Sequence, residues 1–467
     1  MEDTPLKMTQ VLVLHRHGER VPVRHQTRIL GVERLWRQCS IAPFVHALHT
    51  VLDTDKDNDA HATVAPLFPP VIGEIRVIHG DPGDADSKFI AGLKGTNSAN
   101  EGVCNPGQLT DLGKATMHSF GASLRREYSD NLNFLPQILD PDFIANNLYV
   151  RSTGYVRTIE SVQYLLAGLF PLHTRPLGKK GDILIHISAR ENMYIDMGCK
   201  RLRQILEPFR AAAKANTAEE TARIMKKLES LFPDMGKKET APVVSSTPGA
   251  PAEPLSLAEK RAKQFNFREI DLFYDTFKCM SASSIPFPPG VTPSDMDSLS
   301  HIFMESFIGG IADAATPSKS DLKTAQTVRK LLMGRFVGDL LHTMDENIKN
   351  PKNGVKLGIF SGHDTTIGPL LVSLGLFEGE TRAWPKFASN IAFEVFQDTK
   401  RNSNALNAGD EGRYVRVKYN GVAMGLEACK SKGSHYMGDP TLCTYKAFSA
   451  AMRTLIPKNY EQECAPI

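Results

Sequence analysis

The sequence predicts an α/β fold, in which a doubly wound and mainly parallel sheet carries an inserted domain that is mostly helical. Two observations predict it. Short apolar, β-branched runs alternate with helical stretches at both ends of the chain, a pattern typical of parallel sheets with crossover helices. The stretch between them has helical periodicity alone. We therefore expect an α/β core over 1–190 and 311–467, with a helical cap domain over 191–310.

Six short segments are expected to form the strands of the core. Each is apolar and rich in β-branched or aromatic residues. The last two alternate between apolar and polar residues, which indicates a hairpin or a sheet edge. In chain order the segments are QVLVLHRH (10–17), NLYVRST (147–153), GDILIHIS (181–188), KLGIFSGHD (356–364), IAFEVFQD (391–398) and YVRVKYNG (414–421).

Helices are expected between these strands. The first spans 107–128 and begins after Thr110, a residue type suited to the N-cap. A second is expected directly after residue 153, a third over 324–344 and a fourth from residue 365, all with helical spacing of apolar side chains. The apolar side of the first helix is expected to carry Leu112, Ala115, Phe120 and Leu124.

Two stretches are expected to lack regular structure. Residues 25–105 are rich in Gly, Asp and Asn towards their end, which indicates a loop-rich excursion from the core. Residues 236–256 are rich in Pro, Ala, Ser and Thr and have no apolar periodicity, which predicts a disordered insertion in the cap.

Charge and hydropathy exclude several classes of protein. The formal net charge is +3, with Lys and Arg spread along the chain, so no nucleic-acid partner is expected. No apolar run reaches the ~18 residues that a membrane span needs. The first ten residues, MEDTPLKMTQ, have no signal pattern, so the chain as written is expected in the cytoplasm. A targeting segment upstream would instead direct it to mitochondria or the secretory pathway. The sequence does not predict an oligomeric state.

The seven cysteines are scattered and form no CxxC motif. Their odd number leaves at least one thiol free or paired with another chain. Cys429 and Cys443 bracket a short loop and would pair in an oxidising compartment, whereas all seven thiols would stay reduced in the cytosol. The sequence leaves both alternatives open.

Polar side chains follow three of the predicted strands. They are the run Arg16, His17 and Arg20, then Arg151, then the pair His363 and Asp364. Ligands of open α/β sheets bind outside the carboxyl ends of the strands, so these clusters are expected to meet. Arginine binds phosphate with a planar fork, and three arginines would repel one another without a multiply charged anion. The sequence therefore predicts a site for a phosphate monoester.

The same residues predict a reaction. A neutral imidazole can attack phosphorus, and a protonated carboxyl group can give its proton to the leaving alkoxide. A neighbouring phosphate raises the pKa of such a carboxyl group, which favours activity at acid pH. The arginines supply the positive charge that Mg²⁺ supplies elsewhere, so no metal or other cofactor is expected.

The motifs resemble a known family. RHGERVP (16–22) is similar to the RHGxRxP signature of the histidine acid phosphatases, which form branch 2 of the histidine phosphatase superfamily. The resemblance is strongest to the branch of lysophosphatidic acid phosphatase type 6. It extends to NLYVRSTGYVRTIESVQYLLAGL (147–169), SGHDTTIGPLL (361–371), GQLTDLG (107–113), WPKFASNIAFEVF (384–396) and YVRVKYNG (414–421).

The resemblance implies a role for each candidate residue. His17 would be the nucleophile that forms a phosphohistidine, and Asp364 would protonate the leaving group. His363 would add a contact to the phosphate. The phosphoryl oxygens would be held by Arg16, Arg20 and Arg151.

Several functions and side chains stay open at this point. Lysophosphatidic acid is the first substrate that the resemblance implies, and a phytase or inositol phosphate phosphatase is the main rival. A mutase and a catalytically silent phosphate-binding module are further alternatives. His15 is expected in the core, because it alternates away from Arg16. Arg157 is expected in a structural ion pair. Trp384, Pro385 and Phe387 could line a lipid site, but a packed turn is the favoured interpretation.

Overall fold

The computed structural model describes residues 5–23, 36–39, 75–79, 88–89, 104–176, 182–233, 269–400 and 411–466. The insertion predicted at 236–256 lies outside these residues, as does most of the excursion predicted over 25–105. Within the described parts of the chain, no helix is long and apolar enough to cross a membrane.

The centre of the sheet is parallel, as predicted. β1 (Leu6–Arg16) pairs with β6 (Leu357–Gly362), and the sheet continues through β4 (Leu148–Ser152) and β5 (Ile183–Ile187) to β2 (Ile75–His79), with every pair parallel. The five described strands of this centre are thus aligned, which brings their carboxyl ends to one edge of the sheet.

Antiparallel strands continue the sheet on both sides. β7 (Asn390–Asp398) pairs with β1, and β8 (Arg413–Tyr419) pairs with β7, so the edge predicted for these two segments is confirmed. Beyond them lie β9 (Val422–Met424), β11 (Asp439–Thr444) and β10 (His435–Tyr436), while β3 (Lys88–Phe89) pairs with β2 at the opposite edge.

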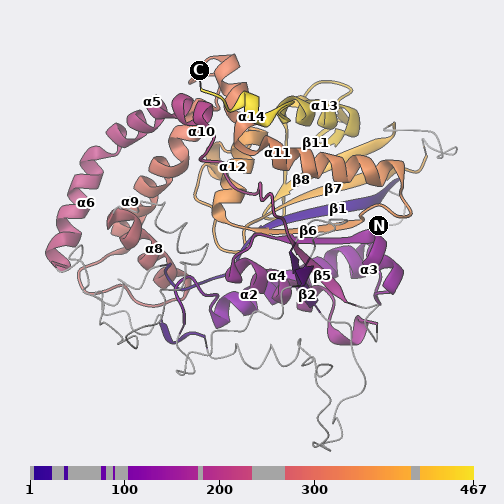
Figure 1. The fold of residues 1–467 in the computed structure, drawn as a ribbon, viewed down its shortest axis with the longest axis horizontal. Coiled ribbons are helices and arrows are strands. Elements are labelled where there is room, and N and C mark those ends of the chain that lie inside the picture. Colours follow the sequence, from indigo (N-terminus) through magenta and orange to yellow (C-terminus); the bar gives the residue numbers. More distant parts are fainter. Residues whose placement is uncertain are drawn as a thin grey trace, which may run out of the picture.

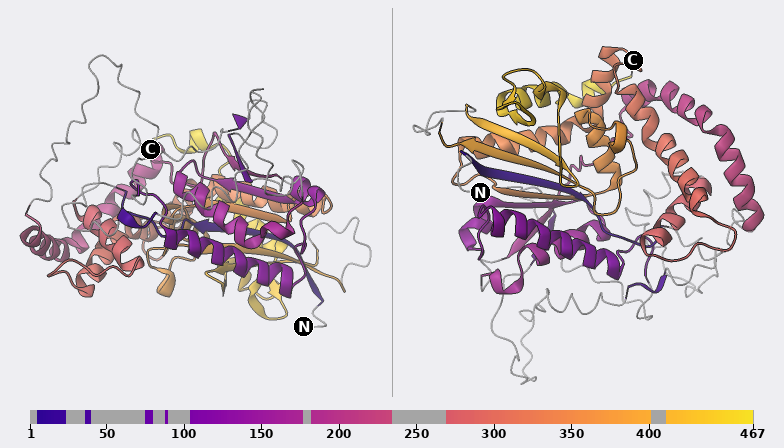
Figure 2. Two further views of the ribbon diagram at one scale, coloured as in Figure 1. Left: turned by 90° about the horizontal axis from the view of Figure 1, so that it is seen from below. Right: turned by 180° about the vertical axis from the view of Figure 1, so that it is seen from behind.

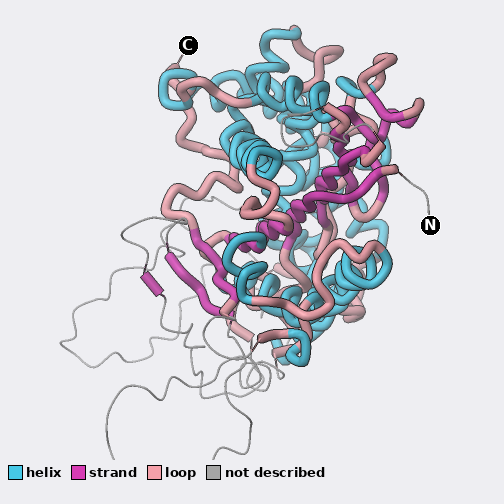
Figure 3. The backbone as a smooth tube through the Cα atoms, turned by 90° about the vertical axis from the view of Figure 1, so that its right-hand side faces the viewer, coloured by secondary structure: helices cyan, strands magenta, loops and turns pink. Residues whose placement is uncertain are grey.

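Helices cover both faces of the sheet (Figures 1 and 3). One face carries α2 (Asp111–Arg125), α3 (Pro141–Asn147) and α4 (Val156–Leu169), and the other carries α11 (Leu322–Lys349), α12 (Asp364–Leu374) and α13 (Tyr445–Leu455). Two apolar clusters follow from this arrangement. Val11 and Val13 of β1 belong to one cluster and Leu12 and Leu14 to the other, as alternation along a strand requires.

The helix predicted over 107–128 is α2, and the Thr110 hydroxyl accepts a hydrogen bond from the Gly113 amide as its N-cap. The prediction of its apolar side was wrong for Leu112, which is 44% exposed, and for Ala115, which is also exposed. The buried positions of α2 are instead Gly113, Lys114, Met117, Gly121 and Leu124, because α2 packs against α4 through glycines rather than through a leucine stripe. A short π-helix, η3 (Arg126–Asn131), continues the chain.

A group of helices between β5 and α11 lies beside the carboxyl edge of the sheet (Figures 1 and 2). We call α5 (Lys200–Asn216), α6 (Ala218–Leu231), α8 (Glu269–Ala282), α9 (Pro293–Met304), η6 (Glu305–Gly309) and α10 (Gly310–Ala314) the cap helices. One apolar cluster contains side chains of the cap helices and of the sheet, so the two pack directly together. The division into a core and a cap domain stays a prediction.

All seven cysteines are among the described residues. Six of them form three disulfides. Cys429 pairs with Cys443, which decides one of the alternatives that the sequence left open. Cys39 pairs with Cys104, and Cys199 before α5 pairs with Cys464 after α14 (Tyr460–Glu463). The free thiol that the odd number required is the buried Cys279 of α8.

Candidate active site

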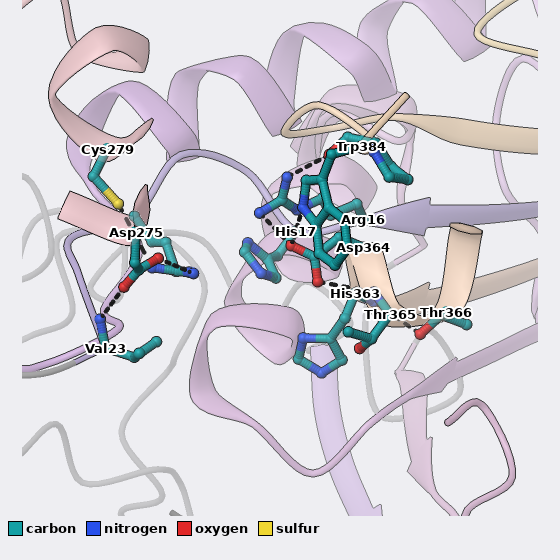
Figure 4. Close-up of polar contacts among 12 residues, drawn as sticks. Arg16, His17, Val23, Asp275, Cys279, His363, Asp364, Thr365, Thr366 and Trp384 are labelled. Carbon is teal, nitrogen blue, oxygen red and sulfur yellow. Dashed lines mark hydrogen bonds and ion pairs between the residues drawn. The ribbon is translucent and has the colours of Figure 1, made fainter. Parts of the chain in front are cut away.

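The polar clusters after β1 and β6 meet at the carboxyl edge of the sheet, as predicted. Arg16 is opposite Gly362 in the parallel register, so His17 and His363 follow neighbouring strands at the same level. Their ring centroids are 5.5 Å apart. Figure 4 shows Arg16, His17, His363 and Asp364 grouped around one point, with Trp384 beside them.

His17 is fully buried and held in one tautomer. Its Nδ1 lies 2.9 Å from the carbonyl oxygen of Gly18, so Nδ1 carries the hydrogen and donates it. Burial lowers the pKa of His17 well below its usual value, and the positive charges of Arg157 and Arg16 lower it further. The imidazole is therefore neutral, with the lone pair on Nε2 free to act as a nucleophile.

Arg16 is 2% exposed and is fixed by three contacts. Its Nη2 lies 2.6 Å from Oδ2 of Asp364, and its Nη1 donates to the carbonyl oxygen of Pro385 at 2.6 Å. The guanidinium lies over the ring of Phe387, 4.1 Å from its centroid. Burial lowers the pKa of Arg16 from its ordinary value, and Asp364 opposes this.

Asp364 is the first residue of α12, directly after His363 at the end of β6. Its Oδ1 accepts a hydrogen bond from the Thr365 amide at 2.8 Å. Its Oδ2 accepts from Arg16 and from Nε1 of Trp384, the latter at 3.1 Å. The carboxyl group is thus held in one orientation beside His17 and His363 (Figure 4).

Arg20 is fixed by a cap helix. Its Nη2 forms an ion pair of 2.8 Å with Asp275 of α8, whose other oxygen accepts from the Val23 amide at 2.9 Å. Its Nη1 donates to the Val21 carbonyl oxygen and lies 3.6 Å from the sulfur of Cys279. Asp275 and the neighbouring thiol raise the pKa of Arg20 despite its burial. The cap therefore supplies the contact that orients this arginine.

Arg151 lies in a different environment from the other candidate residues. Its guanidinium is 2.8 Å from Glu191 and 2.9 Å from Asp339, and it also donates to the side-chain oxygen of Asn192 at 2.7 Å. Two carboxylates already compensate its charge. Within the described residues, no hydrogen bond or ion pair joins Arg151 to His17, His363 or Asp364.

Arg157 occupies the place beside the two histidines. Its Nη2 is 3.4 Å from Nδ1 of His363, and its charge is the largest electrostatic contribution that lowers the pKa of both His17 and His363. Burial lowers the pKa of Arg157 to about 10, so it stays charged at neutral pH. Within the described residues no carboxylate forms an ion pair with Arg157, whose partners there are His363 and the ring of Tyr155.

A signal for Arg157 was present in the sequence. Arg157 lies in the first turn of α4, which begins after Tyr155 and directly follows β4. A helix that starts at the carboxyl end of a central strand points its first turn at the site, where its amides and side chains face a bound anion.

His363 is buried, and its Nε2 donates a hydrogen bond. Its Nε2 lies 2.9 Å from the hydroxyl oxygen of Thr153, and its Nδ1 faces the Arg157 guanidinium, so Nδ1 is the acceptor. Burial, then Arg157 and Arg16, lower the pKa of His363 well below its usual value. This imidazole is also neutral, and both of its ring nitrogens have a protein partner.

Three guanidinium groups converge on the site with unused hydrogens. The Nε atoms of Arg16, Arg20 and Arg157 are buried and have no hydrogen-bond partner among the described residues. The same is true of Nε of Arg151, but two carboxylates bind the other nitrogens of that guanidinium group. Three buried, positively charged donors without a matching acceptor form a site for a small anion with several oxygens. In the described residues no group of three or more His, Cys, Asp or Glu side chains is arranged to hold a metal ion.

Two further predictions concern neighbouring side chains. His15 is fully buried against Phe120 of α2, on the other side of β1 from the site, as predicted. The turn that contains Trp384, Pro385 and Phe387 is packed, as predicted, but its role was missed. All three residues contact the site, through Asp364, Arg16 and the ring of His17.

The fold and this site agree with comparisons to known proteins. The family description "Histidine phosphatase superfamily (branch 2)" matches residues 7–420. The chain belongs to this superfamily. The resemblance seen in the RHG and HD motifs is confirmed.

Relatives and solved structures extend this result. A probable acid phosphatase of Schizosaccharomyces pombe is 25% identical, covering 99% of this chain and 95% of its own. The lysophosphatidic acid phosphatase type 6 of Homo sapiens is 25% identical over 77% of this chain and 69% of its own. The structure of Hafnia alvei phytase has a TM-score of 0.54 at 14% identity and covers both chains completely.

A second solved structure has the same fold. The multiple inositol polyphosphate phosphatase of Bifidobacterium longum, in complex with inositol hexasulfate, has a TM-score of 0.53 at 13% identity, covering 100% of this chain and 96% of its own. At such identities the structures support the fold alone. The family and the sequence relatives confirm the predicted class of enzyme, a histidine acid phosphatase that hydrolyses phosphoric monoesters.

Proposed function

We propose that His17 attacks the phosphorus of a phosphate monoester and forms a phosphohistidine, which water then hydrolyses. One observation carries this proposal. The imidazole of His17 is neutral, buried and fixed by the Gly18 carbonyl oxygen, so that Nε2 is free at the centre of three guanidinium groups. A fixed nucleophile surrounded by donors for the phosphoryl oxygens is the arrangement that phosphoryl transfer needs.

In the first step, Nε2 of His17 forms a bond to phosphorus while the bond from phosphorus to the ester oxygen breaks. Asp364 gives its proton to the departing oxygen, which leaves as an alcohol. In the second step, Asp364 takes a proton from water, the water oxygen binds phosphorus, and the bond to Nε2 breaks. Inorganic phosphate leaves, and His17 and Asp364 return to their starting states.

The arginines bind the phosphoryl oxygens throughout both steps. We assign this role to Arg16, Arg20 and Arg157, with His363 as a further hydrogen-bond partner. Arg151, to which the sequence gave this role, is proposed instead to hold Glu191 and Asn192 in place, because its charge is already matched by two carboxylates. The scheme uses no metal or cofactor, since the guanidinium groups supply the positive charge.

Lysophosphatidic acid is the first substrate that we propose, with monoacylglycerol as the product. Two observations support a partly apolar substrate. Relatives include lysophosphatidic acid phosphatases, and the rings of Tyr155, Tyr194 and Phe387 lie against the two histidines of the site. Aromatic side chains of this kind can contact the glycerol and the first carbons of an acyl chain.

Inositol phosphates are the second candidate, supported by two lysines. Burial lowers the pKa of Lys278 on α8, and the charges of Arg16 and Lys386 lower it further, so the three cations lie near one another. A ligand with more than one phosphate would relieve their repulsion.

We also propose that the protein works in an oxidising compartment rather than in the cytoplasm that the sequence suggested. Six of the seven cysteines pair in the structure. Such disulfides persist in secretory or organellar environments and are rare in the cytosol.

Phosphate release tests the proposed function. Purified wild type and His17→Ala are assayed with p-nitrophenyl phosphate, lysophosphatidic acid and inositol hexakisphosphate between pH 4 and 8. We expect release by wild type and none by the variant, and the ranking of the substrates decides between the two candidates. No release by wild type would contradict the mechanism and favour a silent binding module or a mutase. Equal release by both proteins would show that His17 is not the nucleophile.

A further inference from the structure

The indole of Trp384 contacts the proposed acid of the reaction. Trp384 is 8% exposed, and its Nε1 donates a hydrogen bond to Oδ2 of Asp364 at 3.1 Å (Figure 4). That oxygen also accepts from Arg16, a residue that would turn towards the phosphate. Of the two contacts, the one from Trp384 is therefore the one that does not involve a residue of the phosphate site.

The cap helices hold the indole in place. Phe303 of α9 packs edge-on against Trp384 with ring centroids 4.6 Å apart, and Phe307 of η6 does the same at 5.3 Å. Tyr274 of α8 stacks on Phe303 at 4.2 Å. Four aromatic rings thus form one cluster that spans from the cap to the acid, and it leaves the indole little rotational freedom.

An ion-pair cluster fastens the same segment to the cap a second time. Arg382 donates to both oxygens of Glu305, at 3.0 and 3.2 Å, and to Asp313 at 2.9 Å. Both acids are on the cap side, in η6 and α10. We call residues 382–388 the acid segment, because Trp384 in this segment contacts the proposed acid Asp364. Its two ends reach different groups, since Arg382 contacts the cap and the Ala388 amide donates to the His17 carbonyl oxygen at 3.1 Å.

We propose that Trp384 is a positioning residue for Asp364, and that the cap sets its position through Phe303, Phe307 and Arg382. The indole N–H fixes Oδ2 so that the carboxyl group faces the departing oxygen in the first step. This inference rests on the proposed function, because it needs Asp364 to be the proton donor. A cap that holds the acid in this way links the helices around the substrate to the step that releases the alcohol.

A merely structural role for Trp384 predicts a different result. If the indole only fills space, its loss affects all substrates alike. If it orients the acid, its loss affects substrates according to how much their leaving group needs a proton. The glycerol alkoxide that would leave from β-glycerophosphate is strongly basic and needs a proton, whereas p-nitrophenolate departs as a weakly basic anion.

The test is Trp384→Phe, which removes the N–H and keeps an aromatic ring against Phe303 and Phe307. The matched control is Trp36→Phe, the same change at the chain's other tryptophan. The quantity compared is kcat/KM. For both substrates it reports the steps up to and including phosphoryl transfer to His17. We expect kcat/KM for β-glycerophosphate to fall about 10- to 100-fold in Trp384→Phe, as for the loss of a hydrogen bond to a charged group. For p-nitrophenyl phosphate the fall should be less than about threefold.

Two further measurements complete the test. Inhibition by inorganic phosphate should stay within about twofold of wild type, because the three arginines are untouched. Arg382→Gln loosens the acid segment without removing the indole. It should lower kcat/KM for β-glycerophosphate more than for p-nitrophenyl phosphate, as Trp384→Phe does, but by smaller factors. Trp36→Phe should change neither.

Each outcome decides the inference. An equal fall for both substrates in Trp384→Phe, or no fall for β-glycerophosphate, would overturn it while leaving the proposed function intact. Wild type that releases no phosphate from either substrate would overturn the proposed function, and this inference with it.

Discussion

The arginines in and near the site differ in the groups that bind their Nη atoms. Arg16 is held by Asp364 and Pro385, Arg20 by Asp275, and Arg157 by His363. Arg151 has two carboxylates of its own. An arginine whose charge is neutralised by nearby acids attracts phosphate less than one without such a partner. This contrast leads to a direct test of which arginines bind the phosphate.

We expect Arg157→Gln to lower kcat/KM by about 10²–10³ and to weaken inhibition by phosphate, because a donor to the phosphoryl oxygens is lost. Arg151→Gln should instead lower the melting temperature, because it leaves the partly buried Glu191 without its ion-pair partner, at a cost of about 3 kcal/mol. Steady-state kinetics with p-nitrophenyl phosphate, at a temperature where both variants are folded, measures the first effect. A stronger loss of phosphate affinity in Arg151→Gln than in Arg157→Gln would contradict the assignment.

The buried histidines make stability depend on pH. Burial lowers the pKa of His15 to about 4 from an ordinary value of 6.5. Between these values the unfolded chain binds a proton that the folded protein does not, so stability rises with pH. The contribution of His15 is fully present above pH 6.5 and is lost as pH falls towards 4.

We expect His15→Gln to lose less stability than wild type between pH 7 and pH 4, by at most about 3 kcal/mol. His17 and His363 act in the same direction and remain in both proteins, so the comparison isolates His15. Urea unfolding at the two pH values measures the difference. The same pH dependence in both proteins would show that His15 titrates normally when folded.

At the scale of elements, α2 and α4 pack closely against each other. A Cβ at Gly121 of α2 would overlap the carbonyl oxygen of Leu165, and a Cβ at Gly168 of α4 would overlap that of His118. The two helices thus approach through backbone atoms. Because α4 carries Arg157 and the Ser161 hydroxyl that binds the Gly18 amide, this packing also places part of the site.

Gly121→Ala should therefore lower the free energy of unfolding by about 1–3 kcal/mol or more, since the helices must move apart. Gly425→Ala is the matched control, because its added Cβ would have no atom within 4 Å. Thermal unfolding of both variants measures the difference. Equal melting temperatures for the two variants would mean that α2 and α4 can separate at no cost.

At the scale of the whole molecule, disulfides join parts that are far apart in sequence. Cys199 and Cys464 are 265 residues apart and tie the start of the cap helices to the end of the chain. Cys429 and Cys443 are only 14 residues apart. Cross-links that close longer loops restrict the unfolded chain more strongly.

We expect Cys199→Ser with Cys464→Ser to lose about 5 kcal/mol and Cys429→Ser with Cys443→Ser about 3 kcal/mol, by loop entropy. Thermal unfolding without reductant compares the two double variants. A reductant should lower the melting temperature of wild type in the same sense. A larger loss from the short cross-link would show that native contacts, rather than loop entropy, dominate.

Local pattern in the sequence determined much of this protein. The strands over 10–17, 147–153 and 356–364 and the Thr110 cap follow from periodicity and residue type, which act over a few residues. The meeting of Arg16, His17, His363 and Asp364 follows because parallel strands end at one edge.

The tertiary structure alone decided what required distant partners. Arg151 and Arg157 are six residues apart, and only Glu191, Asp339 and His363 distinguish their environments. The exposure of Leu112 depends on the glycine contact between α2 and α4. Likewise, the contact of Trp384 with Asp364 depends on the cap packing against the sheet. Charge compensation and packing are properties of positions in space, so the order of residues along the chain does not reveal them.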